Sequence, residues 1–175
     1  MSERYPDALG LSRKVLRALI VINPLFGLSI LVLLIASLVA EDFVMKALGA
    51  AHPTSDNSSL VLGMRLIMVV GIAAVPLAQV VLKRLLTIVE TVRAGDPFVT
   101  ENAERLQTIA WSVLGLEILH LIVGIIAASA STKEHPLDID WNFSVTRWLA
   151  VLLLFVLARV FDHGARMRDD LEGTV

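Results

Sequence analysis

The chain has 175 residues, of which 56% are hydrophobic and only 18% are charged, and its net charge is −2. A soluble domain carries roughly half apolar and roughly a quarter charged residues, so this composition argues against a soluble fold. The absence of cysteine from the sequence excludes disulfides, thiolate metal sites and cysteine nucleophiles.

The excess apolar residues lie in four blocks, which predict four membrane-spanning helices. Each block is long enough for the roughly 20 helical residues that cross a hydrocarbon core about 30 Å thick. The expected spans cover residues 17–40, 60–82, 108–129 and 144–160. We therefore predict an all-α polytopic membrane protein, a four-helix transmembrane bundle in one domain over residues 1–175.

The residues before the first span are polar and mildly basic. Leu9, Leu11 and Val15 form a short apolar stripe beside Arg13 and Lys14. This pattern predicts a helix that lies at the level of the lipid headgroups.

Asn23 and Pro24 fall in the early turns of the first span. Proline has no N–H, so it leaves a backbone carbonyl of the preceding turn without a partner. We expect a packing kink in which a neighbouring helix satisfies that carbonyl, with a ligand-binding break as the alternative. The span exceeds the roughly 7–15 apolar residues of a signal peptide, so we expect a retained anchor.

Small residues follow one face of the second and third spans. They are Gly71, Ala74 and Ala78, then Gly124 and Ala128. Small residues let helix backbones approach closely, so these faces suit helix contacts within the chain or in a homo-oligomer.

The segment over residues 83–107 is the long polar stretch between two apolar blocks, and it predicts a hairpin of two helices. Gly95 suits the left-handed conformation that ends a helix, and Pro97 cannot continue it. Thr100 can cap the next helix. We expect an ordered turn rather than a flexible linker.

Basic residues set the orientation of a membrane protein, because they accumulate on the cytoplasmic side. Of the 15 Lys and Arg residues, all except Lys46, Arg65, Lys133 and Arg147 lie in or beside the N-terminal segment, the hairpin or the tail over residues 161–175. We therefore expect a multi-pass protein of a bacterial inner membrane with the hairpin and both termini in the cytoplasm.

Glu117 and His120 lie three residues apart on the third span and so share one face of the helix. An ionisable group at this depth is costly and marks a functional candidate. Four-helix carboxylate metal sites use the Glu-x-x-His spacing twice with two further carboxylates, which one copy of this chain does not offer. A structural polar contact is the main interpretation, and a proton or ion pathway is the alternative.

Other charged residues lie near the ends of the predicted spans or in the predicted outer loops. We expect Arg65 and Arg147 to reach the headgroups, with a contact to Glu117 as the alternative. In the outer loops, we expect His52, His135 and Asp138 to be solvated loop residues, with a site for a divalent cation as the alternative.

The sequence contains no nucleophile elbow, no phosphate-binding glycine loop and no basic groove with interleaved aromatic residues. We therefore expect no enzyme activity, no cofactor and no direct contact with nucleic acid.

Two motifs make the chain similar to a bacterial membrane family, domain-of-unknown-function family 2975. The matching positions are Gly95, Pro97, Phe98, Asn102, Arg105 and Leu106 in the hairpin, and Phe161, Gly164, Met167, Arg168, Thr174 and Val175 in the tail. Met167 and Gly173 stand where the family pattern leads us to expect leucine. The resemblance implies four spans and, as a partner, a small helix-turn-helix regulator. It implies no catalytic residue.

These observations predict a regulatory or interaction protein whose hairpin and tail contact a soluble partner. The candidate contact residues are Gly95, Asp96, Pro97, Phe98, Asn102, Arg105, Phe161, Gly164 and Arg168. The same residues could instead pack against one another, with Phe98 and Phe161 as apolar plugs. The alternatives are a small channel or transporter subunit that uses Glu117 and His120, and a metal-dependent membrane enzyme.

Overall fold

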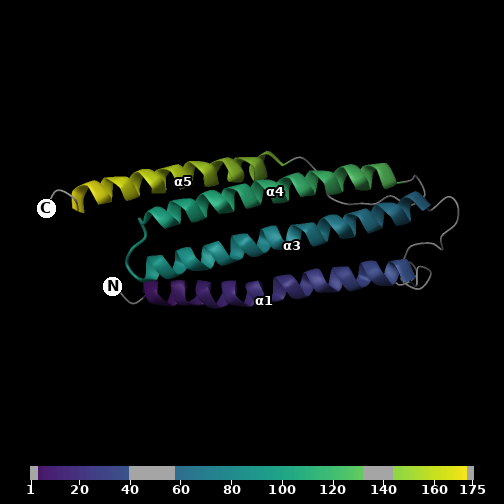
Figure 1. The fold of residues 1–175 in the computed structure, drawn as a ribbon, viewed down its shortest axis with the longest axis horizontal. Coiled ribbons are helices and arrows are strands. Elements are labelled where there is room, and N and C mark those ends of the chain that lie inside the picture. Colours follow the sequence, from purple (N-terminus) through teal and green to yellow (C-terminus); the bar gives the residue numbers. More distant parts are fainter. Residues whose placement is uncertain (1–3, 40–57, 132–143, 173–175) are drawn as a thin grey trace. The chain divides into compact units, whose positions relative to one another are not determined.

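The structure, a computed structural model, describes residues 4–39, 58–131 and 144–172. They form the helices α1 (Arg4–Val39), α3 (Ser58–Arg93), α4 (Thr100–Ala130) and α5 (Val145–Glu172). No strand occurs in these three ranges, so the predicted all-α class is confirmed. Figure 1 shows the long helices in chain order and the turn that joins α3 to α4.

Among the described residues, three helical stretches are long and apolar enough to cross a membrane. They are Leu9–Val39, Ser59–Arg93 and Thr100–Ala130. Large apolar side chains such as Phe26 and Ile125 are exposed along them, as expected for helices that face lipid rather than water. The chain is therefore a membrane protein. A fourth span in α5 stays a prediction, because Arg147 and Arg159 bound the apolar part of that helix.

The first helix is continuous from the polar N-terminal segment into the apolar block. The headgroup-level helix predicted before residue 17 is thus the first part of α1 rather than a separate element. Pro24 lies inside α1 without ending it, and Pro76 lies inside α3 in the same way.

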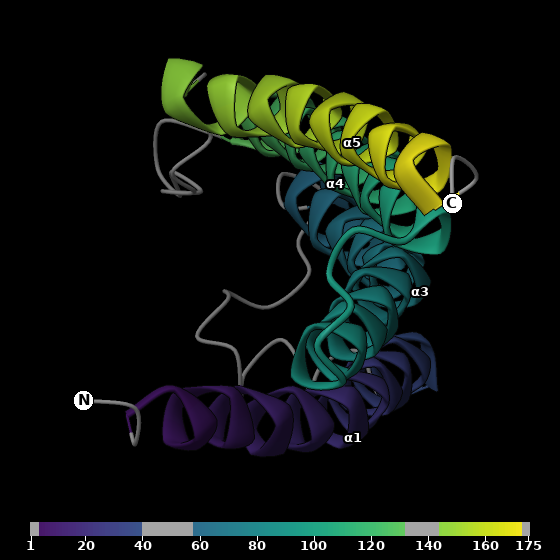
Figure 2. The ribbon, with the colours of Figure 1, turned by 90° about the vertical axis from the view of Figure 1, so that its left-hand side faces the viewer.

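Contacts divide the chain into two compact units. The first, which we name the hairpin unit, consists of the described residues of Met1–Asn23, Leu77–Leu116 and Ser144–Val175. The second unit consists of the described residues of Pro24–Pro76 and Glu117–Phe143. Within the hairpin unit, α3 lies between α1 and α4, and α5 lies beside α4 (Figures 1 and 2).

A polar contact in the hairpin unit explains how α1 tolerates its proline. Pro24 cannot donate to the carbonyl of Ile20, one turn earlier in the helix. The Nε2 atom of Gln79 on α3 donates to that carbonyl at 3.1 Å. The Oε1 atom of Gln79 accepts from Nδ2 of Asn23 at 2.9 Å. A neighbouring helix therefore satisfies the freed carbonyl, as the sequence predicted.

Glycines let helices approach closely within the second unit. A Cβ atom at Gly63 of α3 would overlap Ala130 of α4, and one at Gly27 of α1 would lie 2.8 Å from Cγ2 of Val75. Gly71, from the predicted small-residue face, meets Ile30 at an ordinary contact distance of 3.6 Å. These glycines thus serve contacts between helices of one chain.

The contact of Gln79 with Ile20 leads to a double-mutant prediction. Gln79→Ala should lower the free energy of unfolding by about 1–2 kcal/mol, because it leaves a carbonyl unsatisfied. In a Pro24→Ala background residue 24 regains its N–H, so the same substitution should cost about 1 kcal/mol less. Denaturant titration of the four proteins in micelles measures this coupling. An equal cost in both backgrounds would contradict the role assigned to Gln79.

Candidate functional site: the hairpin cap and the adjoining cleft

The turn between α3 and α4 begins with a Schellman motif. Gly95 has a φ of 89°, in the left-handed region that glycine adopts most readily. Its N–H donates to the carbonyl of Val92 at 3.1 Å, and the N–H of Asp96 donates to the carbonyl of Thr91 at 3.1 Å. These two bonds satisfy carbonyls at the end of α3, so the turn is ordered, as predicted.

A single buried amide then joins the two helices and the turn. Asn102 in the first turn of α4 is 0% exposed. Its Nδ2 atom donates to the hydroxyl of Thr91 at 2.8 Å and to the carbonyl of Pro97 at 2.9 Å. Its Oδ1 atom accepts from Nη1 of Arg105 at 2.7 Å. Thr91 lies in α3, Pro97 in the turn and Arg105 in α4, so the side chain of Asn102 joins all three segments.

The C-terminal helix packs on this turn. The rings of Phe98 and Phe161 lie 5.3 Å apart between centroids, with their planes at 36°. A Cβ atom at Gly164 would lie 3.2 Å from Cδ1 of Phe98, so glycine leaves room for the ring. Arg168 forms an ion pair with Asp96. We name residues 91–105 together with Phe161, Gly164 and Arg168 the hairpin cap.

The N-terminal helix also reaches this end of the hairpin unit. Arg13 and Arg17 of α1 lie 3.3 Å and 3.5 Å from Oε1 of Glu90 on α3. Glu90 and Arg17 are exposed and Arg13 is partly exposed, so the pairs contribute little stability. Glu90 is not among the residues predicted from the sequence, although an acid within a basic stretch is a signal for such pairing.

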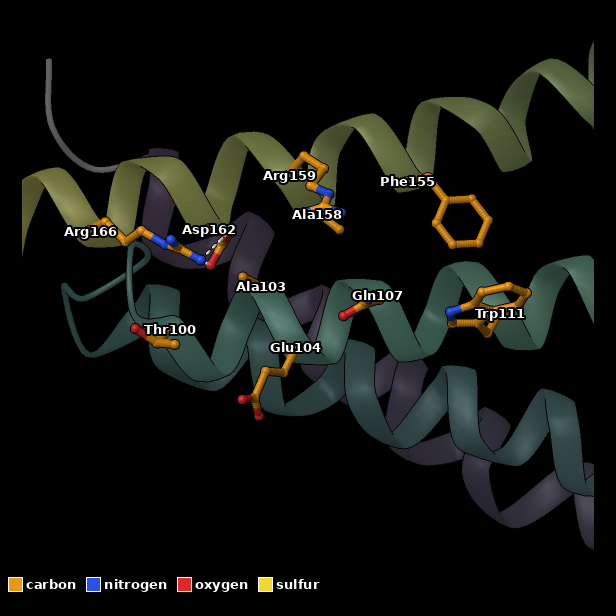
Figure 3. A pocket seen from close by; sticks show the side chains of 10 residues that line it. All are labelled: Thr100, Ala103, Glu104, Gln107, Trp111, Phe155, Ala158, Arg159, Asp162 and Arg166. Atoms are coloured by element: carbon orange, nitrogen blue, oxygen red, sulfur yellow. Dashed lines mark hydrogen bonds and ion pairs between the residues drawn. The ribbon is translucent and has the colours of Figure 1, made fainter.

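A cleft of about 570 Å³ opens between α4 and α5 beside the hairpin cap (Figure 3). At one end the rings of Trp111 and Phe155 meet edge to face, with centroids 5.2 Å apart. The other end is polar, and Arg166 there lies 3.0 Å from Asp162. The polar residues that line the cleft are Thr100, Glu104, Gln107, Arg159, Asp162 and Arg166.

The cleft was not predicted from the sequence, although its lining residues recur at helical spacing. Gln107 and Trp111 lie four residues apart on α4, and Arg159, Asp162 and Arg166 lie three and four residues apart on α5. Such spacing places each set on one helix face. It does not show that the two faces meet, so the cleft itself needed the tertiary structure.

A second pocket, of about 480 Å³, lies by the ring of Phe98 and is mostly apolar. Its lining includes Val160, Gly164 and Met167 of α5. Phe98 is 46% exposed and Met167 53% exposed. The hairpin cap therefore presents apolar side chains beside the ion pair of Asp96 and Arg168.

The intramembrane candidates do not belong to the hairpin unit. Glu117 and His120 belong to the part of α4 in the second unit, and both are half-buried. The Nε2 atom of His120 is buried without a hydrogen-bond partner among the described residues. A structural role and a proton or ion pathway both stay open for these two residues.

The two basic candidates near the span ends lie in different units. Arg65 donates from Nη2 to the backbone carbonyl of Ser37 on α1 at 2.5 Å, within the second unit. Arg147 is half-buried in the first turn of α5, in the hairpin unit. A contact of either residue with Glu117 stays a prediction.

The proposed outer-loop metal ligands His52, His135 and Asp138 lie outside the described residues. So do Thr174 and Val175 of the tail motif. Within the described ranges, no group of three or more His, Asp or Glu side chains is placed to hold a metal ion.

Among the comparisons with known proteins, the one with protein families gives a match. A family model described as "Protein of unknown function (DUF2975)" matches residues 44–175, which include the whole hairpin cap and the cleft. The resemblance found from the two sequence motifs is thereby confirmed. No curated protein and no solved structure matches the chain.

The positive φ of Gly95 leads to a prediction with an internal control. Gly95→Ala should lower the free energy of unfolding by about 1 kcal/mol, because a Cβ atom is strained in the left-handed region. Gly10→Ala on α1 adds a Cβ atom where nothing lies within 4 Å. It should be neutral or stabilise the helix by up to about 1 kcal/mol. Thermal unfolding in micelles compares the two, and equal shifts would refute the assigned role of Gly95.

Proposed function

The chain belongs to the DUF2975 family, and we propose that it is a regulatory or interaction protein of the bacterial inner membrane. In this proposal the hairpin cap faces the cytoplasm and binds a soluble protein. The basic residues of the hairpin unit support that orientation, since Arg13, Arg17, Lys83, Arg84 and Arg93 all belong to it.

The main support for the proposal is that hydrogen bonds and packing within the chain hold the hairpin cap in one conformation. Asn102 is fully buried and bonded to three segments, and Phe98 is held between Phe161 and Gly164. A preformed surface loses little conformational entropy on binding. The exposed parts of Phe98 and Met167 beside the pair of Asp96 and Arg168 combine apolar area with charge, as interfaces do.

The family resemblance supplies the class of partner, a small helix-turn-helix regulator. A regulator held at the hairpin cap would be kept near the membrane and away from DNA. The apolar pocket beside Phe98 suits an apolar side chain of such a partner, since buried apolar anchors dominate most interfaces.

Met167 and Leu152 provide a matched test of this surface. Both are exposed apolar residues of α5, at 53% and 57%, but Leu152 lies within the apolar part of the helix. Met167→Ala should weaken binding of a helix-turn-helix regulator encoded beside the protein by about tenfold, which is about 1.4 kcal/mol. Leu152→Ala should leave binding unchanged. The regulator is titrated against the full chain in lipid nanodiscs, and equal affinities of both variants would overturn the proposed surface.

The absence of cysteine allows a direct test of orientation. Ala94→Cys places a thiol at the hairpin turn, and Ser131→Cys places one at the opposite end of α4; both positions are exposed. With a membrane-impermeant maleimide, Ser131→Cys should label in spheroplasts that retain an intact inner membrane. Ala94→Cys should label only after permeabilisation. Labelling of Ala94→Cys in the intact spheroplasts would place the hairpin cap outside the cytoplasm.

A further inference from the structure

The cleft between α4 and α5 crosses the change from polar to apolar sequence on both helices. On α4 the sequence is mainly polar from Thr100 to Gln107 and mainly apolar after it, and on α5 it is apolar from residue 148 to 158 and then charged at Arg159. Trp111 and Phe155 line the apolar end of the cleft, and Arg159 lines the polar part (Figure 3). A ligand that fills the cleft therefore carries both a polar group and an apolar chain.

The polar part of the cleft presents a net positive charge. Arg166 is paired with Asp162 at 3.0 Å, so these two charges offset each other. Figure 3 shows the carboxylate of Glu104 on the side of α4 that is turned away from α5. Within the described part of the chain, the guanidinium of Arg159 makes no hydrogen bond or ion pair. Arg159 is therefore the charge that a ligand in the cleft meets, and an anionic group complements it.

We propose that this cleft binds an anionic phospholipid, such as phosphatidylglycerol, through its phosphate group. The guanidinium of Arg159 donates to the phosphate oxygens, for which its planar fork is well suited. The amide of Gln107, on the α4 side of the cleft, adds a donor for the same headgroup. An acyl chain runs past the rings of Trp111 and Phe155 into the bilayer. This inference does not depend on the proposed soluble partner.

The aromatic end of the cleft favours a lipid over a water-soluble phosphate. Trp111 is 60% exposed where α4 becomes apolar, and tryptophan is enriched where a membrane meets water. Its ring meets that of Phe155 edge to face, with 5.2 Å between the centroids, so the two rings form one apolar wall. An inorganic phosphate would contact Arg159 and leave this wall uncovered, whereas an acyl chain covers it.

Quenching of Trp111 fluorescence by brominated lipids measures which headgroup the cleft prefers. The substitutions Trp141→Phe and Trp148→Phe leave Trp111 as the single tryptophan of the full chain, which is reconstituted in phosphatidylcholine vesicles. Brominated phosphatidylglycerol should quench Trp111 more strongly than equal shares of brominated phosphatidylethanolamine or phosphatidylcholine, whose headgroups carry no net charge. Arg159→Gln should weaken the relative affinity for phosphatidylglycerol by about tenfold, because a charge-assisted contact is lost. Arg84→Gln, at an exposed cation of α3 that does not line the cleft, should leave that affinity unchanged.

Two substitutions of an acid by its amide test whether the cleft itself, rather than the charge of the whole surface, attracts the lipid. Asp162→Asn removes the partner of Arg166 and adds one positive charge inside the cleft, so it should tighten phosphatidylglycerol binding by several-fold. Glu104→Gln adds the same charge on the side of α4 turned away from α5, so it should change binding much less. Because a misfolded protein does not bind more tightly, the gain in Asp162→Asn decides the question even if Arg159→Gln does not fold.

The proposal fails on any of three results. One is quenching by phosphatidylglycerol no stronger than that by phosphatidylcholine. Another is an equal loss in Arg159→Gln and Arg84→Gln, or an equal gain in Asp162→Asn and Glu104→Gln, either of which would show a general effect of surface charge. The third is full displacement of the brominated phosphatidylglycerol by millimolar inorganic phosphate, which would identify a soluble-phosphate site instead.

Discussion

The buried amide of Asn102 is the interaction on which the hairpin end of this protein depends. Its hydrogen bonds reach Thr91 in the last turn of α3, Pro97 in the connecting turn and Arg105 in the second turn of α4. A buried polar group left without a partner costs about 1–3 kcal/mol, so these segments hold one another in place. Phe98, which lies in this turn, packs against Phe161 and Gly164 of α5.

Buried polar groups also need hydrogen-bond partners in the apolar part of the chain. Lipid supplies no hydrogen bonds, so a backbone carbonyl freed by proline needs a donor from another helix. Gln79 supplies it to Ile20, and α1 continues through Pro24 without a break. Arg65 donates in a similar way to the carbonyl of Ser37. Gln79 and Arg65, two polar side chains in a very apolar protein, thus donate hydrogen bonds to backbone carbonyls.

The last helix carries two faces with different chemistry. Phe161, Gly164 and Arg168 recur at spacings of three and four residues and meet the turn. Phe155, Arg159, Asp162 and Arg166 recur at similar spacings and line the cleft with α4. Helical periodicity separates such sets onto distinct stripes. The surface proposed to bind a partner and the cleft are therefore neighbours on α5, and Arg159 lines both the cleft and the apolar pocket beside Phe98.

The sequence by itself determined the all-α class, the membrane character, the family and the turn at Gly95, because block length, composition and local backbone chemistry act over a few residues. It also showed that Pro24 would free a carbonyl. Only the tertiary structure decided that Gln79, 59 residues from Ile20, supplies the donor, and that Arg168, 72 residues from Asp96, closes the hairpin cap. Periodicity assigns each residue to a face of its own helix, but which faces meet depends on how the helices pack, and the cleft between α4 and α5 follows from that packing alone.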